Sequence, residues 1–239
     1  MTHTNHRRGS TESLTHDFIV LAMVDPAVPA QHTYREPLSE RVHRLYQILA
    51  KQEPVALNGK DTHRKRYLQY WEPEQDSGVH QSATIPEVKS CKQMESVTHA
   101  VYTNKEAVQN VLTALREADL GISIVVSGLF DEVFEICQQS GLMPHTVNMS
   151  LGTWGKTERL PPRSVLELCT MCGHAVISRR LVEKMIAQIK QGTINSRKAA
   201  VELGKQCTCN IFNTVRGRTL LQNAIQTSRD SEGNGPLRH

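Results

Sequence analysis

The sequence predicts an α/β fold in which a small parallel or mixed sheet precedes a C-terminal helical subdomain with a four-cysteine site. Two observations support this fold class. Between residues 94 and 160, apolar runs typical of buried strands alternate with helical periodicity in the order β-α-β-α-β. From residue 161 to residue 227, only helical periodicity remains. Because a helical crossover of about a dozen residues joins parallel strands, we expect the core strands to be parallel neighbours.

The N-terminal part of the chain shows fewer clear elements. Residues 1–16 are polar and predict a disordered tail. The continuous apolar run at 18–24 predicts a buried strand, and apolar residues at helical spacing predict an amphipathic helix over 38–51. The pattern does not show how residues 17–93 pack against the rest, and the polar stretch at 60–93 predicts a domain boundary.

The α/β core is predicted over residues 94–160. A strand at 97–103 is followed by Asn104, whose side chain is a good N-cap for the next helix. A second strand at 122–126 leads into another helix, which we expect to end at a C′ glycine, Gly141. Residues 145–150 alternate with a period of two and predict a third strand.

The helical subdomain is predicted over residues 161–227, and residues 228–239 form a polar tail. Ser178 is a typical N-cap, and Gly192 stands where a C′ glycine is expected. The predicted helices cover residues 164–168, 179–190, 196–203 and 213–225.

Composition limits the environment and the partners. The net charge is +4, and the basic residues fall in short scattered groups instead of one extended stripe, so we expect nucleic acid to be an unlikely partner. There is no run of 18 apolar residues, and the N-terminus lacks the apolar region of a signal peptide. We therefore expect a cytoplasmic protein without a membrane partner, whose thiols are kept reduced.

Four of the six cysteines form two close pairs. Cys169 and Cys172 are separated by two residues, and Cys207 and Cys209 by one. Thiolates at this spacing can turn toward one ion or cluster, and two such pairs supply a complete set of four sulfur ligands. His174 lies two residues beyond Cys172 and is a candidate additional ligand or hydrogen-bond donor.

Three interpretations of these cysteines remain open. We expect an iron–sulfur cluster, of the 4Fe–4S type, because the short C-x-C pair suits neighbouring irons and apolar flanks would exclude water. Structural zinc is the alternative, because four cysteines also satisfy its tetrahedral preference. The third interpretation is that the cysteines are buried thiols without a metal, since cysteine often behaves as a small apolar residue. We also expect a helix N-terminus after each pair to stabilise thiolate.

A ligand site is predicted beyond the carboxyl ends of the strands. The Ser127–Gly128 turn lies between a strand and a helix, where backbone N–H groups can hold an anion. Gly152 and Gly155 let the backbone approach a ligand, and Lys156 adds a positive charge. In a parallel sheet these groups lie on one side, together with the polar side chains of the third predicted strand, which are His145, Asn148 and Ser150.

These predictions lead to a hypothesis about function. The protein is expected to be a cytoplasmic iron–sulfur enzyme or accessory protein that acts on an anionic small molecule. The alternative is a structural zinc protein whose α/β part binds a ligand or regulates a partner. The sequence does not indicate the substrate, the reaction or the oligomeric state, and no local motif selects a catalytic triad.

Overall fold

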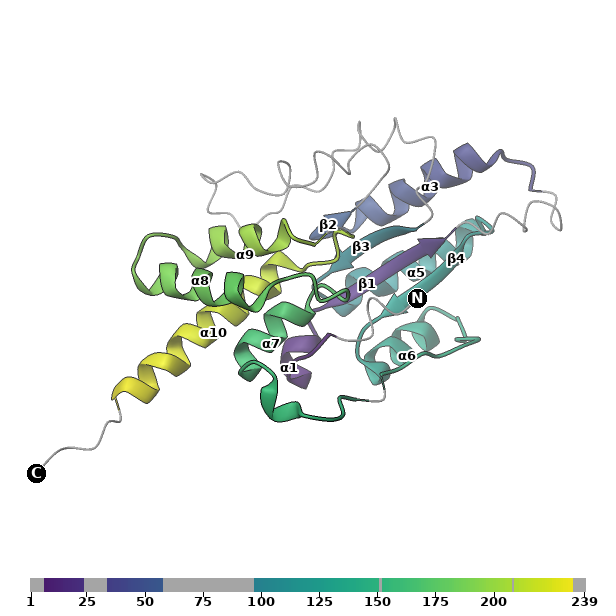
Figure 1. The fold of residues 1–239 in the computed structure, drawn as a ribbon. Coiled ribbons are helices and arrows are strands. Elements are labelled where there is room, and N and C mark those ends of the chain that lie inside the picture. The colour runs from purple at the N-terminus through teal and green to yellow at the C-terminus, as the bar shows by residue number, and fades with distance from the viewer. Residues whose placement is uncertain (1–6, 24–33, 58–96, 151, 208, 234–239) are drawn as a thin grey trace, which may run out of the picture. The chain divides into compact units, whose positions relative to one another are not determined.

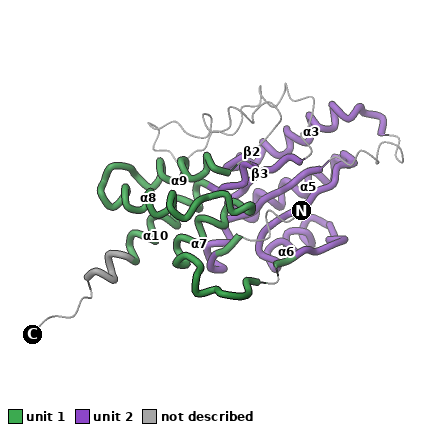
Figure 2. The backbone as a smooth tube through the Cα atoms, viewed as in Figure 1, with its two compact units in different colours: residues 1–8, 149–208, 214–239 green, residues 9–148, 209–213 purple. Residues whose placement is uncertain are grey.

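The chain divides into two compact units (Figure 2). The sheet unit comprises Gly9–Asn148 with Cys209–Asn213, and the helical unit comprises Met149–Thr208 and Thr214–His239 with Met1–Arg8. The predicted boundary at 60–93 lies outside the described residues, and the predicted domain limits stay predictions. The computed structural model describes residues 7–23, 34–57, 97–150, 152–207 and 209–233 (Figure 1).

The sheet unit contains a four-stranded antiparallel sheet with the order β2-β3-β1-β4. Each pair of neighbours is antiparallel, with Val20 opposite Ala100 of β3 on one side and opposite Val126 of β4 on the other. The apolar run predicted to be a buried strand is confirmed as β1, one of the two interior strands. The strands are β1 (Phe18–Met23), β2 (Ala56–Leu57), β3 (Thr98–Tyr102) and β4 (Ser123–Ser127).

The predicted parallel arrangement is wrong. Strands β3 and β4 are joined through α5 (Lys105–Ala118) and run in the same direction, because both are antiparallel to β1. However, β1 lies between them, so they are not neighbours. The helical crossover sets the relative direction of the two strands that it joins. It does not determine whether a strand from elsewhere in the chain is inserted between them.

The third predicted strand is also wrong. Residues 145–150 form no strand, and Val147 and Met149 are exposed. Alternation of apolar and polar residues produces a strand only where a neighbouring strand accepts its backbone hydrogen bonds. None of the described strands pairs with this segment. The predicted β-α-β-α-β core is therefore reduced to β3-α5-β4-α6, with α6 at Phe130–Gln139.

Helices α3 (Leu38–Lys51) and α5 pack side by side against the sheet, as Figure 1 shows. The predicted amphipathic helix over 38–51 is thus confirmed, with Leu45 and Leu49 on its buried face. Helix α6 packs against α5. One core cluster joins strands and helices, and its members include Phe18, Val20, Leu45, Tyr46, Leu49, Leu57, Tyr102, Val108, Val111, Leu112 and Ile136.

Two buried tyrosines connect the sheet to α3 through hydrogen bonds. The hydroxyl of Tyr46 is 2.8 Å from Thr98 Oγ1, and the hydroxyl of Tyr102 donates to the carbonyl of Leu49 at 2.7 Å. Burial raises the pKa of Tyr102 above its ordinary value, because the phenolate would lose its hydration. The hydroxyl of Tyr102 therefore remains a neutral hydrogen-bond donor inside the core.

The predicted helix caps are confirmed. Asn104 Oδ1 accepts from the backbone N–H of Ala107 at 2.7 Å. Gly141 follows the C-cap of α6 with φ 66°, and its N–H donates to the carbonyl of Gln138. Such left-handed backbone at C′ favours glycine. The short N-terminal helix α1 (Thr11–Leu14), capped by Ser10, lies within the segment predicted to be a disordered tail.

The helical unit is built from four α-helices and a short 3₁₀ segment among its described residues. Helix α10 packs against α7, α8 and α9, and α8 packs against both α7 and α9. The predicted cap Ser178 and the C′ glycine Gly192, with φ 72°, are confirmed at the two ends of α8. The elements are η1 (Thr157–Arg159), α7 (Arg163–Thr170), α8 (Arg179–Lys190), α9 (Ser196–Gly204) and α10 (Thr214–Gly233).

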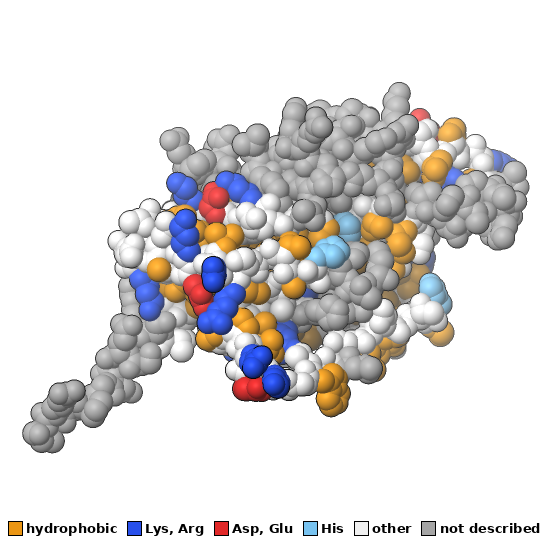
Figure 3. All heavy atoms as spheres, in the orientation of Figure 1, with side chains coloured by type: hydrophobic (Ala, Val, Ile, Leu, Met, Phe, Trp, Pro, Cys, Tyr) orange, Lys and Arg blue, Asp and Glu red, His pale blue; other side chains and the backbone are white. Residues whose placement is uncertain are grey.

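Basic residues concentrate in the helical unit. Residues 152–227 contain twelve Lys and Arg against four Asp and Glu, a formal net charge of +8. The whole chain has 28 basic and 24 acidic residues, so the remainder has 16 and 20, a net charge of −4. Figure 3 shows Lys and Arg side chains gathered over α7, α8 and α9 on the face drawn there. The modest net charge of the whole chain is thus the sum of a strongly basic segment and an acidic remainder.

We predict that Gly128→Ala destabilises the sheet unit by about 1–3 kcal/mol, the usual cost of overpacking a core. A Cβ at this position would lie 2.7 Å from Cδ1 of the fully buried Phe18 and 3.0 Å from Cγ2 of Val133. Chemical denaturation monitored by circular dichroism measures the cost. In a Phe18→Leu background the cost should be smaller, because the ring that meets the Cβ is gone. An equal cost in both backgrounds would contradict this explanation.

Candidate metal centre

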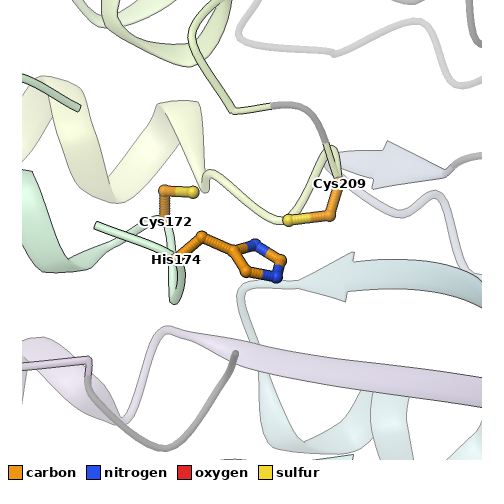
Figure 4. A group of neighbouring side chains, drawn as sticks. All are labelled: Cys172, His174 and Cys209. Carbon is orange, nitrogen blue, oxygen red and sulfur yellow. The ribbon is translucent and has the colours of Figure 1, made fainter. Parts of the chain in front are cut away.

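Three side chains converge in a group suited to binding a metal ion. Cys172, His174 and Cys209 each offer one ligand atom, and these atoms all lie within 4.8 Å of one another. Figure 4 shows the two sulfur atoms pointing toward one another, with the imidazole ring alongside. Cys172 is buried, Cys209 is partly buried and His174 is exposed. The group therefore has a buried side and a side open to solvent.

A tight turn brings Cys172 and His174 together. Helix α7 ends at Thr170, and Cys172 follows its C-cap residue Met171. The carbonyl of Cys172 accepts a hydrogen bond from the N–H of Ala175 at 2.8 Å. Ala175 has φ 53°, a left-handed backbone conformation that is uncommon for residues other than glycine. The chain therefore reverses directly after α7 and presents two ligands two residues apart.

The third ligand comes from the segment that connects α9 and α10. Asn210, directly after Cys209, has φ 56°, so a left-handed residue follows this ligand as one follows His174. Further along, Asn213 is fully buried, and its Nδ2 donates to the carbonyl of His16 at 2.9 Å and to Asp17 Oδ1 at 3.2 Å. This anchored asparagine limits the freedom of the short segment that holds Cys209.

The electrostatic role predicted for helix N-termini does not apply to Cys172. The N-cap of α8 is Ser178, six residues after Cys172, and the influence of a helix dipole is confined to the terminal turn. Cys172 instead follows the C-terminus of α7, which carries the negative end of the dipole. That end favours a cation, so the position is suited to a bound metal ion.

The donor set fits zinc. Two thiolates and an imidazole are ligands that Zn²⁺ takes in tetrahedral sites, at about 2.3 Å for sulfur and about 2.0–2.1 Å for nitrogen. Atoms at these distances from a common ion lie roughly 3.3–3.8 Å apart. Separations of up to 4.8 Å for Cys172, His174 and Cys209 thus require only side-chain adjustment. Three protein ligands leave one tetrahedral position for water or a further ligand.

The other two predicted cysteine ligands lie outside this group. Among the described residues, neither Cys169 nor Cys207 belongs to a cluster of three or more potential ligands, and both are buried. Burial raises the pKa of the Cys169 thiol, and the nearby Glu183 carboxylate raises it further, while Arg179 opposes the shift. The protonated form of Cys169 is therefore favoured. All five described cysteines are present as thiols.

Of the two cysteines outside the close pairs, only Cys137 lies among the described residues. Cys137 is buried on the inner face of α6, as its position in the helical pattern predicts, and burial raises its thiol pKa. Cys91 lies outside the described residues. His174, which the sequence presented as a candidate additional ligand, lies in the group with Cys172 and Cys209. The C-x-H spacing of Cys172 and His174 is the sequence feature that indicates this ligand.

The predicted anion site depended on a parallel sheet, and the sheet is antiparallel. The site required the Ser127–Gly128 turn and the third predicted strand to end on the same side, and that strand does not form. Gly128 has a packing role against Phe18 instead. Lys156 is exposed next to η1 in the helical unit, and the residues of the failed strand are all exposed: His145, Asn148 and Ser150. Their role as ligand-binding residues stays a prediction.

The N-terminus of α6 is poorly suited to an anion. It has no side-chain cap, and Asp131 and Glu132 occupy its first turn. Acidic side chains there already satisfy the positive end of the helix dipole and repel a second negative charge. The predicted anion site at the Ser127–Gly128 turn stays a prediction, and these two acidic side chains count against it.

Comparison with known proteins provides no relative from which a function could be transferred. No protein-family model matches the chain, and no curated protein or solved structure is significantly similar to it. Among the described helices, none combines the length and the apolar character needed to span a bilayer. The case for function therefore depends on the side chains themselves.

We predict that Co²⁺, a spectroscopic substitute for zinc, binds with two thiolate ligands. Cys172→Ala and Cys209→Ala should each weaken the thiolate-to-cobalt absorption and reduce affinity by more than the roughly 10- to 100-fold that loss of a supporting partner costs. Cobalt titration followed by ultraviolet and visible absorption measures both effects.

Cys169→Ala and Cys207→Ala are the matched controls for this titration. Both remove a buried thiol outside the group, so cobalt affinity and absorption should persist. If either control loses cobalt as completely as Cys172→Ala, the ligand set is the four-cysteine set predicted from spacing.

Proposed function

We propose that the protein is a zinc-binding protein in which Cys172, His174 and Cys209 hold the ion and the ion stabilises the helical unit. The observation that carries this proposal is the convergence of two thiols and one imidazole within 4.8 Å. Such a set of soft and borderline donors is typical of zinc, whereas hard ions such as Mg²⁺ and Ca²⁺ take oxygen ligands.

The donor set favours zinc over an iron–sulfur cluster. Clusters are usually held by four cysteine thiolates, and only Cys172 and Cys209 contribute thiols to the group. Histidine replaces cysteine in some clusters, but there two histidines accompany two cysteines. The iron–sulfur hypothesis drawn from the sequence is therefore the alternative outcome of metal analysis. The anionic substrate is not part of this proposal, because Asp131 and Glu132 oppose an anion at α6.

A structural role for the ion follows from the size of the helices. Helices α7 and α9 have 8 and 9 residues, and helices this short are marginal without tertiary support. The ion would tie the turn after α7 to the segment after α9. Because a formed site does not exist in the unfolded chain, the free energy of metal binding adds to the free energy of folding.

Anaerobic purification followed by elemental analysis and an optical spectrum tests the identity of the metal. We expect one equivalent of zinc and no visible absorption. Iron with acid-labile sulfide and broad visible absorption would overturn the zinc assignment in favour of the cluster. A protein that holds no transition metal, even after incubation with zinc and a reductant, would overturn the metal proposal as a whole.

We further predict that chelation of zinc loosens the helical unit selectively. At a metal concentration about 1,000 times the dissociation constant, binding stabilises the folded state by about 4 kcal/mol. Hydrogen exchange with and without chelator should therefore show faster exchange in α7, α8 and α9, while β1 and α5 stay protected.

The His174→Ala protein is the control for this experiment. Because this variant lacks one ligand from an exposed turn and no core side chain, it should fold but respond weakly to the chelator. Unchanged exchange in α7, α8 and α9 of the natural protein, once its metal has been removed, would contradict a structural role.

A further inference from the structure

We infer that the helical unit binds single-stranded nucleic acid through the basic faces of α8 and α9 and through the exposed indole of Trp154. This inference is independent of the metal. It begins from the net charge of +8 over residues 152–227, which contrasts with −4 over the rest of the chain. A strongly basic surface within a near-neutral chain is typical of proteins that bind a polyanion.

The basic side chains of α8 lie on its solvent face. Arg180 and Lys184 are exposed and one helical turn apart, while Val182 and Met185 are buried in the helical unit. Helix α9, which packs against α8, has the same arrangement, with Lys198 exposed at its start. Neighbouring helices thus present basic groups that are separated in the sequence, as Figure 3 shows over α8 and α9. The scattered sequence pattern hides this grouping.

The acidic residues of the helical unit do not neutralise this surface. Glu183 pairs with Arg179 at 2.7 Å, Glu202 with Lys205 at 2.5 Å, and Glu167 with Arg163 at 2.8 Å. Three of the four acidic side chains over residues 152–227 are thus each paired with one basic side chain. The Arg179–Glu183 and Lys205–Glu202 pairs are solvent-accessible, and ion pairs of this kind contribute about 0–1 kcal/mol. Phosphate groups can therefore compete with these carboxylates for the paired Lys and Arg side chains. Lys and Arg also outnumber Asp and Glu over residues 152–227, so a surplus of basic side chains remains.

Trp154 supplies the second, independent observation. Its side chain is 82% exposed, although an indole is among the most apolar surfaces that a chain can present. The flanking glycines have φ 101° and 87°, and a Cβ at either would have no atom within 4 Å. The exposed Lys156 and Arg159 follow in the same segment. A planar aromatic ring beside cationic groups is the combination that binds unpaired bases, with stacking worth about 1–3 kcal/mol per base.

A single strand fits these features better than a membrane surface. A helix that binds in the bilayer interface exposes its apolar face to lipid. In α8 and α9 that face is buried, with Val182 and Leu203 fully inaccessible. Duplex recognition would use the phosphates without requiring an exposed indole, because paired bases are not available for stacking. Vesicles and duplexes are therefore comparison ligands in the test.

The test uses the full-length protein as purified and a fluorescein-labelled single-stranded RNA of mixed sequence. Fluorescence anisotropy gives the dissociation constant at several salt concentrations. We expect affinity to fall linearly with salt on logarithmic axes, with a slope of about −0.7 for each phosphate contact. Absence of binding at low salt would overturn the inference. So would binding to anionic phosphatidylserine vesicles without binding to RNA.

Paired variants separate charge from stacking. Arg180→Ala with Lys184→Ala should reduce the salt slope by about 1.4, from two lost contacts. Trp154→Ala should weaken binding on the order of ten- to a hundredfold with an unchanged slope. The matched control, Arg44→Ala with Lys51→Ala, removes the same two charges from α3 in the sheet unit and should leave both quantities unchanged. Equal effects of the two double variants would show that only net charge matters and would overturn the assigned surface.

A direct measurement of stacking is also available. The chain has two tryptophans, so a Trp71→Phe protein emits from Trp154 alone. RNA should quench this emission in proportion to binding, and a duplex of the same length should quench it less. Unchanged emission at saturating RNA, or equal binding and quenching by the duplex, would overturn the assignment of Trp154 as a platform for unpaired bases.

Discussion

Burial of β1 on both faces is the constraint on which the sheet unit depends. Residues 18–22 have no exposed surface, and full burial of a large apolar side chain contributes about 1.5–3 kcal/mol. A strand this apolar is stable only inside a sheet, with a neighbouring strand on each side. Its insertion between β3 and β4 explains why the sheet is antiparallel although a helix connects those two strands.

Local features of the fold could be predicted from the sequence, and long-range pairing could not. Asn104 and Ser178 were identified as caps, and Gly141 and Gly192 as C′ residues, because the physical causes act within a few residues. Strand order depends on contacts between residues about 80 positions apart, such as Phe18 and Tyr102. The local pattern of apolar and polar residues does not indicate which distant strands pair. The alternating segment at 145–150 shows the same limit, because a strand requires a partner that its own pattern does not specify.

The sequence could predict that cysteines form the candidate metal centre, but not which cysteines belong to it. The spacing of the cysteines indicated a metal and identified Cys172 and Cys209 correctly as members of the group. It could not distinguish them from Cys169, since both residues of a C-x-x-C pair have the same local signal. The distinction comes from the end of α7: Cys169 lies in the last turn of the helix, whereas Cys172 lies in the turn beyond it and shares that turn with His174.

The exposure of His174 bears on how quickly a bound ion would exchange. Cys172 is buried and Cys209 partly so, whereas the imidazole of His174 is exposed to solvent. An incoming thiolate or imidazole from another molecule can replace such a ligand first, and the ion can then leave by stepwise ligand exchange instead of by unfolding. With this order of release, occupancy of the site would follow the supply of zinc around the folded protein.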